Sequence, residues 1–254
     1  MDIIFIGAGN LATRLAKEIH RLKINIRQIY SRTKENAKLL ADSIGCQYTD
    51  NISEIIPGAD CYIFSVKDSA LQELISNMPP NNGLWLHTSG SISMSIFKGY
   101  TERYGVFYPL QTFSKSREVN FDNIPIILES NTDKDAETIE QLAKIISKDV
   151  RFLSSEQRKQ VHIAAVFACN FTNHLYHLAS NLLKEKGISP DIILPLIDET
   201  AAKTHCMTPG EAQTGPAIRY DENVINKHLD AIEDPDVATI YRLLSHSIHK
   251  TNKK

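Results

Sequence analysis

The chain has 254 residues, which is long for one domain and sufficient for two, each with a core of its own. Hydrophobic residues make up 42% of it and charged residues 23%, and a formal net charge of -2 gives no bulk attraction to nucleic acid or to an anionic membrane. The four cysteines form no CxxC pair, no stretch reaches the ~18 apolar residues of a membrane span, and a strand predicted from the second residue leaves no room for a signal peptide. We therefore expect a two-domain cytoplasmic protein that binds neither nucleic acid nor membrane.

An apolar run at residues 2–6 leads into a glycine turn, after which leucine and isoleucine recur at helical spacing. The turn has the sequence Gly7-Ala8-Gly9-Asn10-Leu11-Ala12. In a strand–turn–helix unit of this kind the first glycine permits a tight turn, the second lets the backbone approach a pyrophosphate, and the small alanine lets the helix pack on the strand. We predict that Gly7, Ala8, Gly9, Asn10 and Leu11 bind a dinucleotide at the helix N-terminus, and a plain turn is the alternative.

The second predicted strand, residues 24–30, ends in Ser31-Arg32-Thr33. An NAD site usually places a carboxylate here for the ribose 2′-hydroxyl, whereas an NADP site replaces it with an arginine that binds the 2′-phosphate. This strand ends without an acidic residue, and a guanidinium has the donor geometry that suits a phosphate. We therefore predict NADP rather than NAD as the cofactor, with Ser31, Arg32 and Thr33 at the 2′-phosphate. A solvated arginine at a strand end is the alternative.

Two further strands are predicted to end at the same edge of the sheet. Residues 61–66 end next to Lys67, and residues 83–86 lead into His87-Thr88-Ser89-Gly90-Ser91. Ligands of open α/β sheets bind beyond the carboxyl ends of the strands, so the residues expected to contact the cofactor are Ser65, Val66, Lys67 and Thr88. We expect Ser89 to orient a substrate and His87 to exchange a proton, and a hydrogen-bonded structural role for His87 is an equal alternative.

Strands and helices alternate as far as residue 153. Other strands are predicted at residues 105–108, 124–128 and 150–153, and helices at 11–22, 35–44, 71–75 and 135–147. After Ser154, a predicted helix cap, the pattern contains helices only, up to about residue 186 and then at 190–203, 222–232 and 235–249. We therefore predict an α/β domain with a Rossmann-type, mostly parallel sheet at residues 1–153 and an all-helical domain at 154–254.

His162, Val166, Asn170 and His174 recur every four residues along the long predicted helix and so share one face. For His162 and Asn170 we favour the wall of a ligand cleft over a satisfied core network, because ligand sites collect at domain interfaces. No third ligand is placed near these histidines, so we expect no metal site.

Thr214 and Arg219 belong to a loop that contains a Gly-Pro turn and precedes the third predicted helix of this region. Polar groups on a constrained loop suit a contact with a ligand or a subunit. Arg219 is a candidate clamp for an anionic substrate, and an ion pair with Asp221 or Glu222 is an equal alternative.

Five motifs carry a family resemblance. They are Gly7-Ala8-Gly9-Asn10-Leu11-Ala12, His87-Thr88-Ser89-Gly90-Ser91, Pro109-Leu110-Gln111-Thr112-Phe113, His162-Ile163-Ala164-Ala165 with Asn170, and Thr214-Gly215-Pro216 with Arg219 and Asp221. With them the chain resembles, over nearly its whole length, bacterial Rossmann-like proteins with an all-helical C-terminal domain, related to deazaflavin-dependent NADP reductases and pyrroline-5-carboxylate reductases. The resemblance implies a helical domain similar to that of 6-phosphogluconate dehydrogenase, a homodimer formed through it, and oxidoreductase activity, but no particular substrate.

The chain departs from its relatives at three positions. Family members tend to have His where this chain has Tyr108, and Gly where it has Tyr220. Hydroxyacid dehydrogenases of similar layout carry a catalytic lysine four residues before the helix asparagine, and Val166 occupies that position here. Because valine cannot move a proton, a donor must come from His87, His162 or Tyr108.

Two functions are consistent with these residues. In the first, an NADP-dependent oxidoreductase transfers hydride to or from a small carbonyl or imine substrate bound between the domains. Its catalytic candidates are His87, Ser89, His162 and Asn170, and its substrate-binding candidates are Tyr108, Thr214 and Arg219. In the second, the protein binds NADP without turnover, as a sensor or scaffold, which the missing lysine supports. An open pocket beside the nicotinamide site would favour the enzyme.

Overall fold

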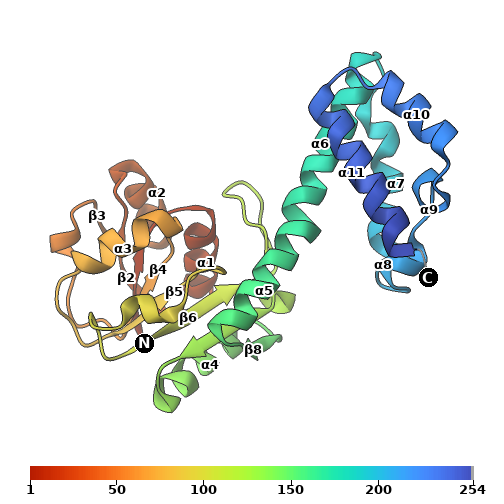
Figure 1. Ribbon diagram of the computed structural model, residues 1–254. Helices are drawn as coiled ribbons and strands as arrows, with labels where there is room; N and C mark the ends of the chain where they lie inside the picture. Colours follow the sequence, from red (N-terminus) through yellow and green to blue (C-terminus); the bar gives the residue numbers. More distant parts are fainter. Residues whose placement is uncertain (253–254) are drawn as a thin grey trace. The chain divides into compact units, whose positions relative to one another are not determined.

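The computed structural model describes residues 1–252, and the chain divides into two compact units, Met1–Asn170 and Phe171–Lys254 (Figure 1). The first unit contains an eight-stranded sheet with the order β3-β2-β1-β4-β5-β6-β7-β8. Its strands are β1 (Asp2–Ile6), β2 (Asn25–Tyr30), β3 (Gln47–Thr49), β4 (Cys61–Phe64), β5 (Leu84–His87), β6 (Tyr104–Pro109), β7 (Ile126–Ser130) and β8 (Val150–Phe152). Strands β1 to β6 run parallel, and β7 and β8 run in the opposite direction. The predicted Rossmann-type, mostly parallel α/β fold is confirmed.

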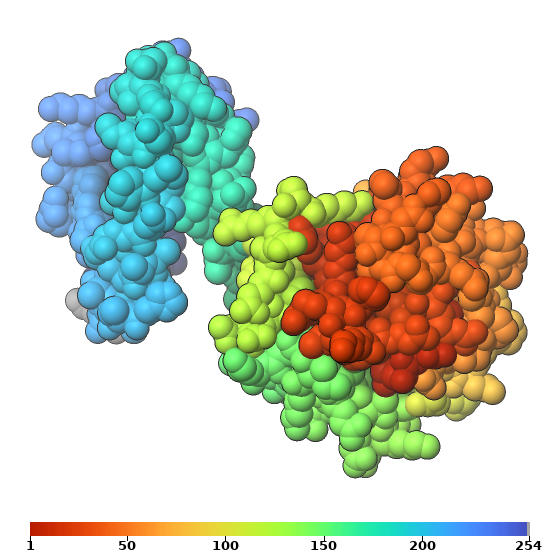
Figure 2. Space-filling view, turned by 180° about the vertical axis from the view of Figure 1, so that it is seen from behind, coloured from red at the N-terminus to blue at the C-terminus, as the bar shows by residue number. Residues whose placement is uncertain are grey.

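Helices cover both faces of this sheet. They are α1 (Asn10–Arg21), α2 (Lys34–Ile44), α3 (Asp68–Ser76), α4 (Asp133–Ile146) and α5 (Ser155–Ala165), with short 3-10 segments η1 (Ile52–Glu54), η2 (Met94–Phe97) and η3 (Phe121–Asn123). The loop at residues 110–120, yellow-green in Figure 2, follows β6 and lies along α1. It therefore brings a segment from the middle of the unit back to the first helix of the chain.

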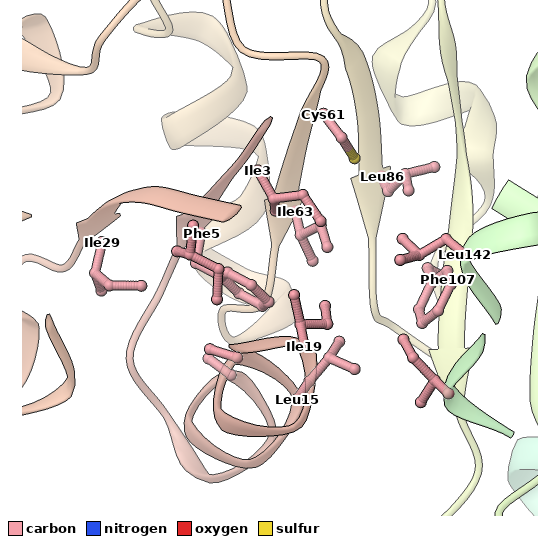
Figure 3. Close-up of a cluster of buried hydrophobic side chains, with 14 of the residues drawn as sticks. Ile3, Phe5, Leu15, Ile19, Ile29, Cys61, Ile63, Leu86, Phe107 and Leu142 are labelled. Carbon is pink, nitrogen blue, oxygen red and sulfur yellow. The ribbon is translucent and has the colours of Figure 1, made fainter. Parts of the chain in front are cut away.

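The larger core lies between the sheet and helices α1, α2 and α4 (Figure 3). Ile3 and Phe5 of β1 point to this face, whereas Ile4 and Ile6 point to the other, where they meet α3. All four are fully buried because the central parallel strands are covered on both faces. This accounts for the unbroken apolar runs that predicted the strands.

Helix α5 is attached to the sheet by a buried ion pair. Arg158, with 0% of its surface exposed, forms its ion pair with Glu129 of β7 and also donates to the carbonyl of Ile92. Ser155 donates to the same carboxylate at 2.8 Å, and Val161 packs on the sheet next to them. The predicted cap at Ser154 is present as a capping box with Gln157.

The chain then enters a π-helical segment, η4 (Val166–Phe171), in which the first unit ends. Alternation of strands and helices stops after β8, as predicted, but α5 belongs by its contacts to the sheet unit. The sequence predicts a regular α-helix through these residues. A four-residue repeat does not distinguish an α-helix from a π-helix, so the π-helical segment was not predicted. The turn is wider in a π-helix than in an α-helix, but His162, Val166 and Asn170 still line a common pocket, in agreement with the expected shared face.

The second unit is helical throughout its described residues. Its elements are α6 (Thr172–Glu185), η5 (Pro190–Ile193), α7 (Leu194–Lys203), α8 (Pro209–Ala212), α9 (Pro216–Arg219), α10 (Glu222–Ala231) and α11 (Pro235–Asn252). Tyr220 adopts a left-handed conformation with φ 51° and stacks on His249 with ring centroids 4.4 Å apart. Among residues 1–252, no helix combines the length and the apolar character that crossing a bilayer requires.

We predict that Arg158→Met destabilises the protein, because it leaves the Glu129 carboxylate without its buried cation. The expected loss is about 3–5 kcal/mol in the free energy of unfolding, measured by urea denaturation. Arg151→Ala is the control, since it removes an arginine whose ion pair with Asp149 is exposed, and we expect it to leave the midpoint nearly unchanged. Equal midpoints for the two variants would contradict the role given to Arg158.

Candidate functional site

A pocket of about 570 Å³ lies where β1, β2, β4 and β5 end, and we call it the main pocket. Its wall contains all the residues that the sequence assigned to the cofactor: Gly7, Ala8, Gly9, Asn10, Leu11, Ser31, Arg32, Thr33, Ser65, Val66, Lys67 and Thr88. The strand order reverses at β1, which pairs with β2 on one side and β4 on the other. Ligands of open α/β sheets bind at such a reversal.

Gly7 passes between the ends of β2 and β4 at very close range. Its amide donates to the carbonyl of Tyr30 at 2.7 Å, and its φ is +123°, a conformation that L side chains rarely adopt. A Cβ added here would lie 2.2 Å from the carbonyl oxygen of Ser65. Only glycine allows the turn to stay this close to β4.

Gly9, the next glycine of the motif, faces open space. A Cβ added to it would meet nothing within 4 Å, although Gly9 stands at the N-cap of α1. In the described chain no side chain caps α1, and its first turn contains no acidic residue. The N–H groups of that turn lack helical acceptors. This end of the main pocket therefore fits an anionic pyrophosphate.

The end of β2 fits a second anionic group. Arg32 follows the strand, is exposed and lines the main pocket, and within residues 1–252 it forms no ion pair. Ser31 and Thr33 contribute hydroxyl groups beside it. A cation without a carboxylate partner has the charge that a ribose 2′-phosphate requires.

Tyr108 and His162 meet at the other end of the main pocket. The Tyr108 hydroxyl lies 3.0 Å from Nδ1 of His162, and the rings form an edge-on contact. Gly90 makes room for them, since an added Cβ would lie 2.5 Å from Nδ1 of His162. Burial raises the pKa of Tyr108, and the positive charge of Arg158 acts in the opposite direction. The phenol is therefore protonated at neutral pH.

A second pocket of about 490 Å³ adjoins the main pocket at Tyr108 and His162, and we call it the side pocket. The rest of its wall is formed by Leu110, Gln111, Thr112, Val161, Ala164, Ala165, Val166, Ala168, Cys169 and Asn170. These described residues include no Asp, Glu, Lys or Arg. Val166 and Asn170 of this wall belong to the π-helical segment η4. The side pocket has room for a small, largely uncharged molecule.

His87 does not line either pocket. It is completely buried, its Nδ1 accepts a hydrogen bond from the backbone amide of Ser89 at 3.2 Å, and its Nε2 has no partner among the described residues. Burial, together with the positive charge of Arg158, lowers the pKa of His87 to about 3, which favours the neutral ring. His87 is therefore a neutral residue whose hydrogen bond holds the backbone of Ser89. Ser89 itself lines the main pocket.

Thr214 and Arg219 lie beside and within α9 of the second unit, and both are exposed. Arg219 forms no ion pair with any described residue, and Asp221 accepts a hydrogen bond from the backbone of Val224 and caps α10. Their part in substrate binding stays a prediction. Within residues 1–252 no group of three metal-ligating side chains occurs.

Eight residues of the main pocket were not predicted as site residues from the sequence: Tyr30, Asn36, Asp68, Ala70, Leu74, Gly90, Ser91 and Lys115. Asp68 follows Lys67 and accepts a hydrogen bond from Ser91, so its position after a strand end was a usable signal. Gly90 was quoted within a motif without a role. Lys115 reaches the pocket from the loop after β6, and no local pattern indicates this.

Comparison with known proteins finds two family models. The model described as NADP oxidoreductase coenzyme F420-dependent matches residues 2–86, and the model of a domain of unknown function, DUF2520, matches residues 124–248. Among curated proteins no sequence matches this chain.

Several solved structures are similar over the whole chain. A protein of Bacteroides fragilis described as a "putative NADP oxidoreductase" is 50% identical, with 98% of each chain covered and a TM-score of 0.92. A Thermotoga maritima protein is 21% identical, with 99% of this chain and 100% of that chain covered and a TM-score of 0.82. An imine reductase of Myxococcus stipitatus, in complex with NADP+, is 12% identical, with 100% and 93% covered and a TM-score of 0.66, and shares the fold.

We predict that His87 makes the protein less stable in acid. The pKa of His87 is about 3 in the folded state and near 6.5 when unfolded, so the unfolded chain takes up the proton first. The contribution of the neutral ring is complete above pH 6.5 and is lost between pH 6.5 and 3, at about 1.4 kcal/mol per pH unit.

His87→Asn is the matched variant, because its side-chain oxygen can still accept from the Ser89 amide and does not titrate. Urea denaturation at pH 7 and pH 4.5 should show a smaller acid loss for His87→Asn than for the wild type. The same loss in both proteins would show that His87 is not the group responsible.

Proposed function

Because this chain belongs to the family of NADP oxidoreductases that includes the Bacteroides fragilis protein, we propose that it transfers hydride between NADP and a small carbonyl or imine compound. The cofactor is NADP. The observation that carries the proposal is the contact between two pockets. The main pocket has the dinucleotide-binding elements, and it meets the side pocket at the hydrogen-bonded pair Tyr108–His162.

The residues of the main pocket fit each part of NADP. Gly9 leaves space beside the uncapped N-terminus of α1 for the pyrophosphate, and Arg32 is available for the 2′-phosphate. When bound, NADPH supplies the hydride, and the protein supplies position and protons. Ser65, Val66 and Thr88 lie on the wall between the two ends, where Thr88 donates to Ser65 at 3.2 Å.

Tyr108 is the proton donor in this proposal. Tyr108 lines both pockets, and its raised pKa keeps its hydroxyl protonated at neutral pH. As the substrate carbon accepts hydride, its oxygen or nitrogen takes the proton of Tyr108. His162, at 3.0 Å, then returns a proton to the phenolate. Hydroxyacid dehydrogenases use a lysine for this proton transfer, and this chain has Val166 at that position. We propose that Tyr108 and His162 take over the role of the lysine.

The side pocket indicates the class of substrate. Its wall combines small apolar residues with a few uncharged polar ones, which suits a compact uncharged group. Asn170 in this pocket and Ser89 in the main pocket can orient a carbonyl or imine. The imine reductase that shares the fold supports this class. Space beside Tyr108 also favours turnover over a sensor that binds NADP without reaction.

The homodimer implied by the family resemblance is part of the proposal. On the second unit, Ile192, Leu194, Leu196 and Leu243 each have more than half of their surface exposed in the isolated chain. A second copy of the chain is the occupant that we propose for these apolar side chains.

We predict that Gly9→Val leaves the fold intact and weakens NADPH binding. An added Cβ meets no protein atom within 4 Å, so the thermal midpoint should change little, while the branched side chain occupies the space given to the pyrophosphate. We expect at least a roughly tenfold rise in the Kd for NADPH, measured by calorimetry. Gly210→Ala, at another glycine with open surroundings, is the control. Unchanged affinity in Gly9→Val would contradict the placement of the pyrophosphate.

We predict that Tyr108→Phe lowers kcat by roughly a hundredfold or more, because general acid catalysis contributes on that scale. NADPH affinity should stay within a factor of about two, since only the hydroxyl group is removed. The assay follows NADPH absorbance with a panel of small ketones, aldehydes and cyclic imines. Tyr104→Phe, on the same strand but outside both pockets, is the control. A Tyr108→Phe enzyme with wild-type kcat would exclude the phenol as donor.

A further inference from the structure

A lysine from a distant loop lies at the same end of the main pocket as Arg32. Lys115 lines this pocket, and its Nζ donates to Oδ1 of Asn36 at 3.1 Å. Asn36 belongs to the first turn of α2, which begins directly after the Ser31–Thr33 segment. The ammonium group of Lys115 is therefore held over the turn at which NAD and NADP are distinguished.

The loop that carries Lys115 is attached to α1 by a buried arginine. Arg14 has only 8% of its surface exposed, and its guanidinium donates to the carbonyl of Ser114 at 2.9 Å and to that of Lys115 at 2.7 Å. Phe113 is stacked on Phe121 with ring centroids 5.7 Å apart, which holds the loop on the core. The backbone at Lys115 is thus fixed at two neighbouring points.

The charges of the main pocket favour a dianion at this end. Its wall has three cationic side chains, Arg32, Lys67 and Lys115, and none of them forms an ion pair within the part of the chain that the structure describes. The one carboxylate of the wall, Asp68, accepts a hydrogen bond from Ser91. Lys67 follows β4, whereas Arg32 follows β2 and Lys115 contacts Asn36 of α2. Arg32 and Lys115 are therefore the two cations available to one phosphate at the end of β2.

From this geometry we propose that Lys115 is a second specificity residue for NADP: it binds the 2′-phosphate together with Arg32, and Arg14 is the positioning residue that holds it there. The inference rests on the proposed function, because it concerns the same bound cofactor. It adds a determinant outside the strand end where cofactor preference is normally sought. In the absence of the phosphate, the side-chain oxygen of Asn36 accepts the hydrogen bond of the Lys115 ammonium group.

The test compares Kd values for NADPH and NADH in the wild type, Lys115→Ala and Arg117→Ala. Arg117 is an exposed cation of the same loop that does not line the pocket, so its removal changes the net charge equally. We expect Lys115→Ala to raise the Kd for NADPH about tenfold and to leave the Kd for NADH unchanged. Arg117→Ala should change neither Kd. Lys115→Arg keeps a cation at this position and should retain most of the preference for NADPH over NADH. The fragments adenosine 2′,5′-bisphosphate and 5′-AMP should reproduce the difference without the nicotinamide end.

Arg14→Met tests the positioning role. If Arg14 only stabilised the fold, both cofactors would weaken alike, whereas loss of position lowers the NADPH preference specifically. A wild-type preference for NADPH that Lys115→Ala leaves unchanged would overturn this inference alone. A wild type that binds neither cofactor would overturn the proposed function as well.

Discussion

The site depends on one close approach, that of Gly7 to the carbonyl of Ser65. The chain leaves β1 between β2 and β4 and turns at once into α1, at a distance that leaves no volume for a Cβ and at a φ that favours glycine. This turn directs the N-terminus of α1 to the edge where the parallel strands end. The uncapped N-terminus of α1 therefore lines the main pocket, where we propose that the pyrophosphate binds.

The remaining parts of the site follow from that turn and from two attachments. Arg158 connects α5 to β7, which places His162 within 3.0 Å of Tyr108, and Arg14 connects the loop after β6 to α1, which places Lys115 near Arg32. Both arginines are buried and bind oxygen atoms of distant segments. A buried guanidinium that is paired with oxygen atoms costs less than an unpaired one, although Nε of Arg158 itself has no partner among the described residues. Our proposal therefore places proton transfer and phosphate selection at opposite ends of the main pocket.

The sequence predicts most of the fold and the phosphate end of the site, because these are encoded locally. The glycine turn, the missing acid after β2 and the apolar strands each lie within a few neighbouring residues. His87 shows the limit: its motif suggests a proton donor, but burial by Phe97 and the sheet is a tertiary property, and the structure turns it away from both pockets. Tyr108 and His162, 54 positions apart, and Lys115 and Asn36, 79 apart, meet only through the sheet topology. The four-residue repeat through Val166 also gives no sign of the π-helical turn that places Asn170 at the side pocket.

The central claim is that the turn at Gly7 and the cations beyond β2 form one NADP-selective site. The most direct measurement is a calorimetric titration of the wild-type protein with NADPH and NADH under the same conditions. We expect one site per chain and an affinity for NADPH at least about tenfold higher than for NADH, corresponding to about 1.4 kcal/mol from the 2′-phosphate. Equal affinities, or no binding of either dinucleotide, would contradict it.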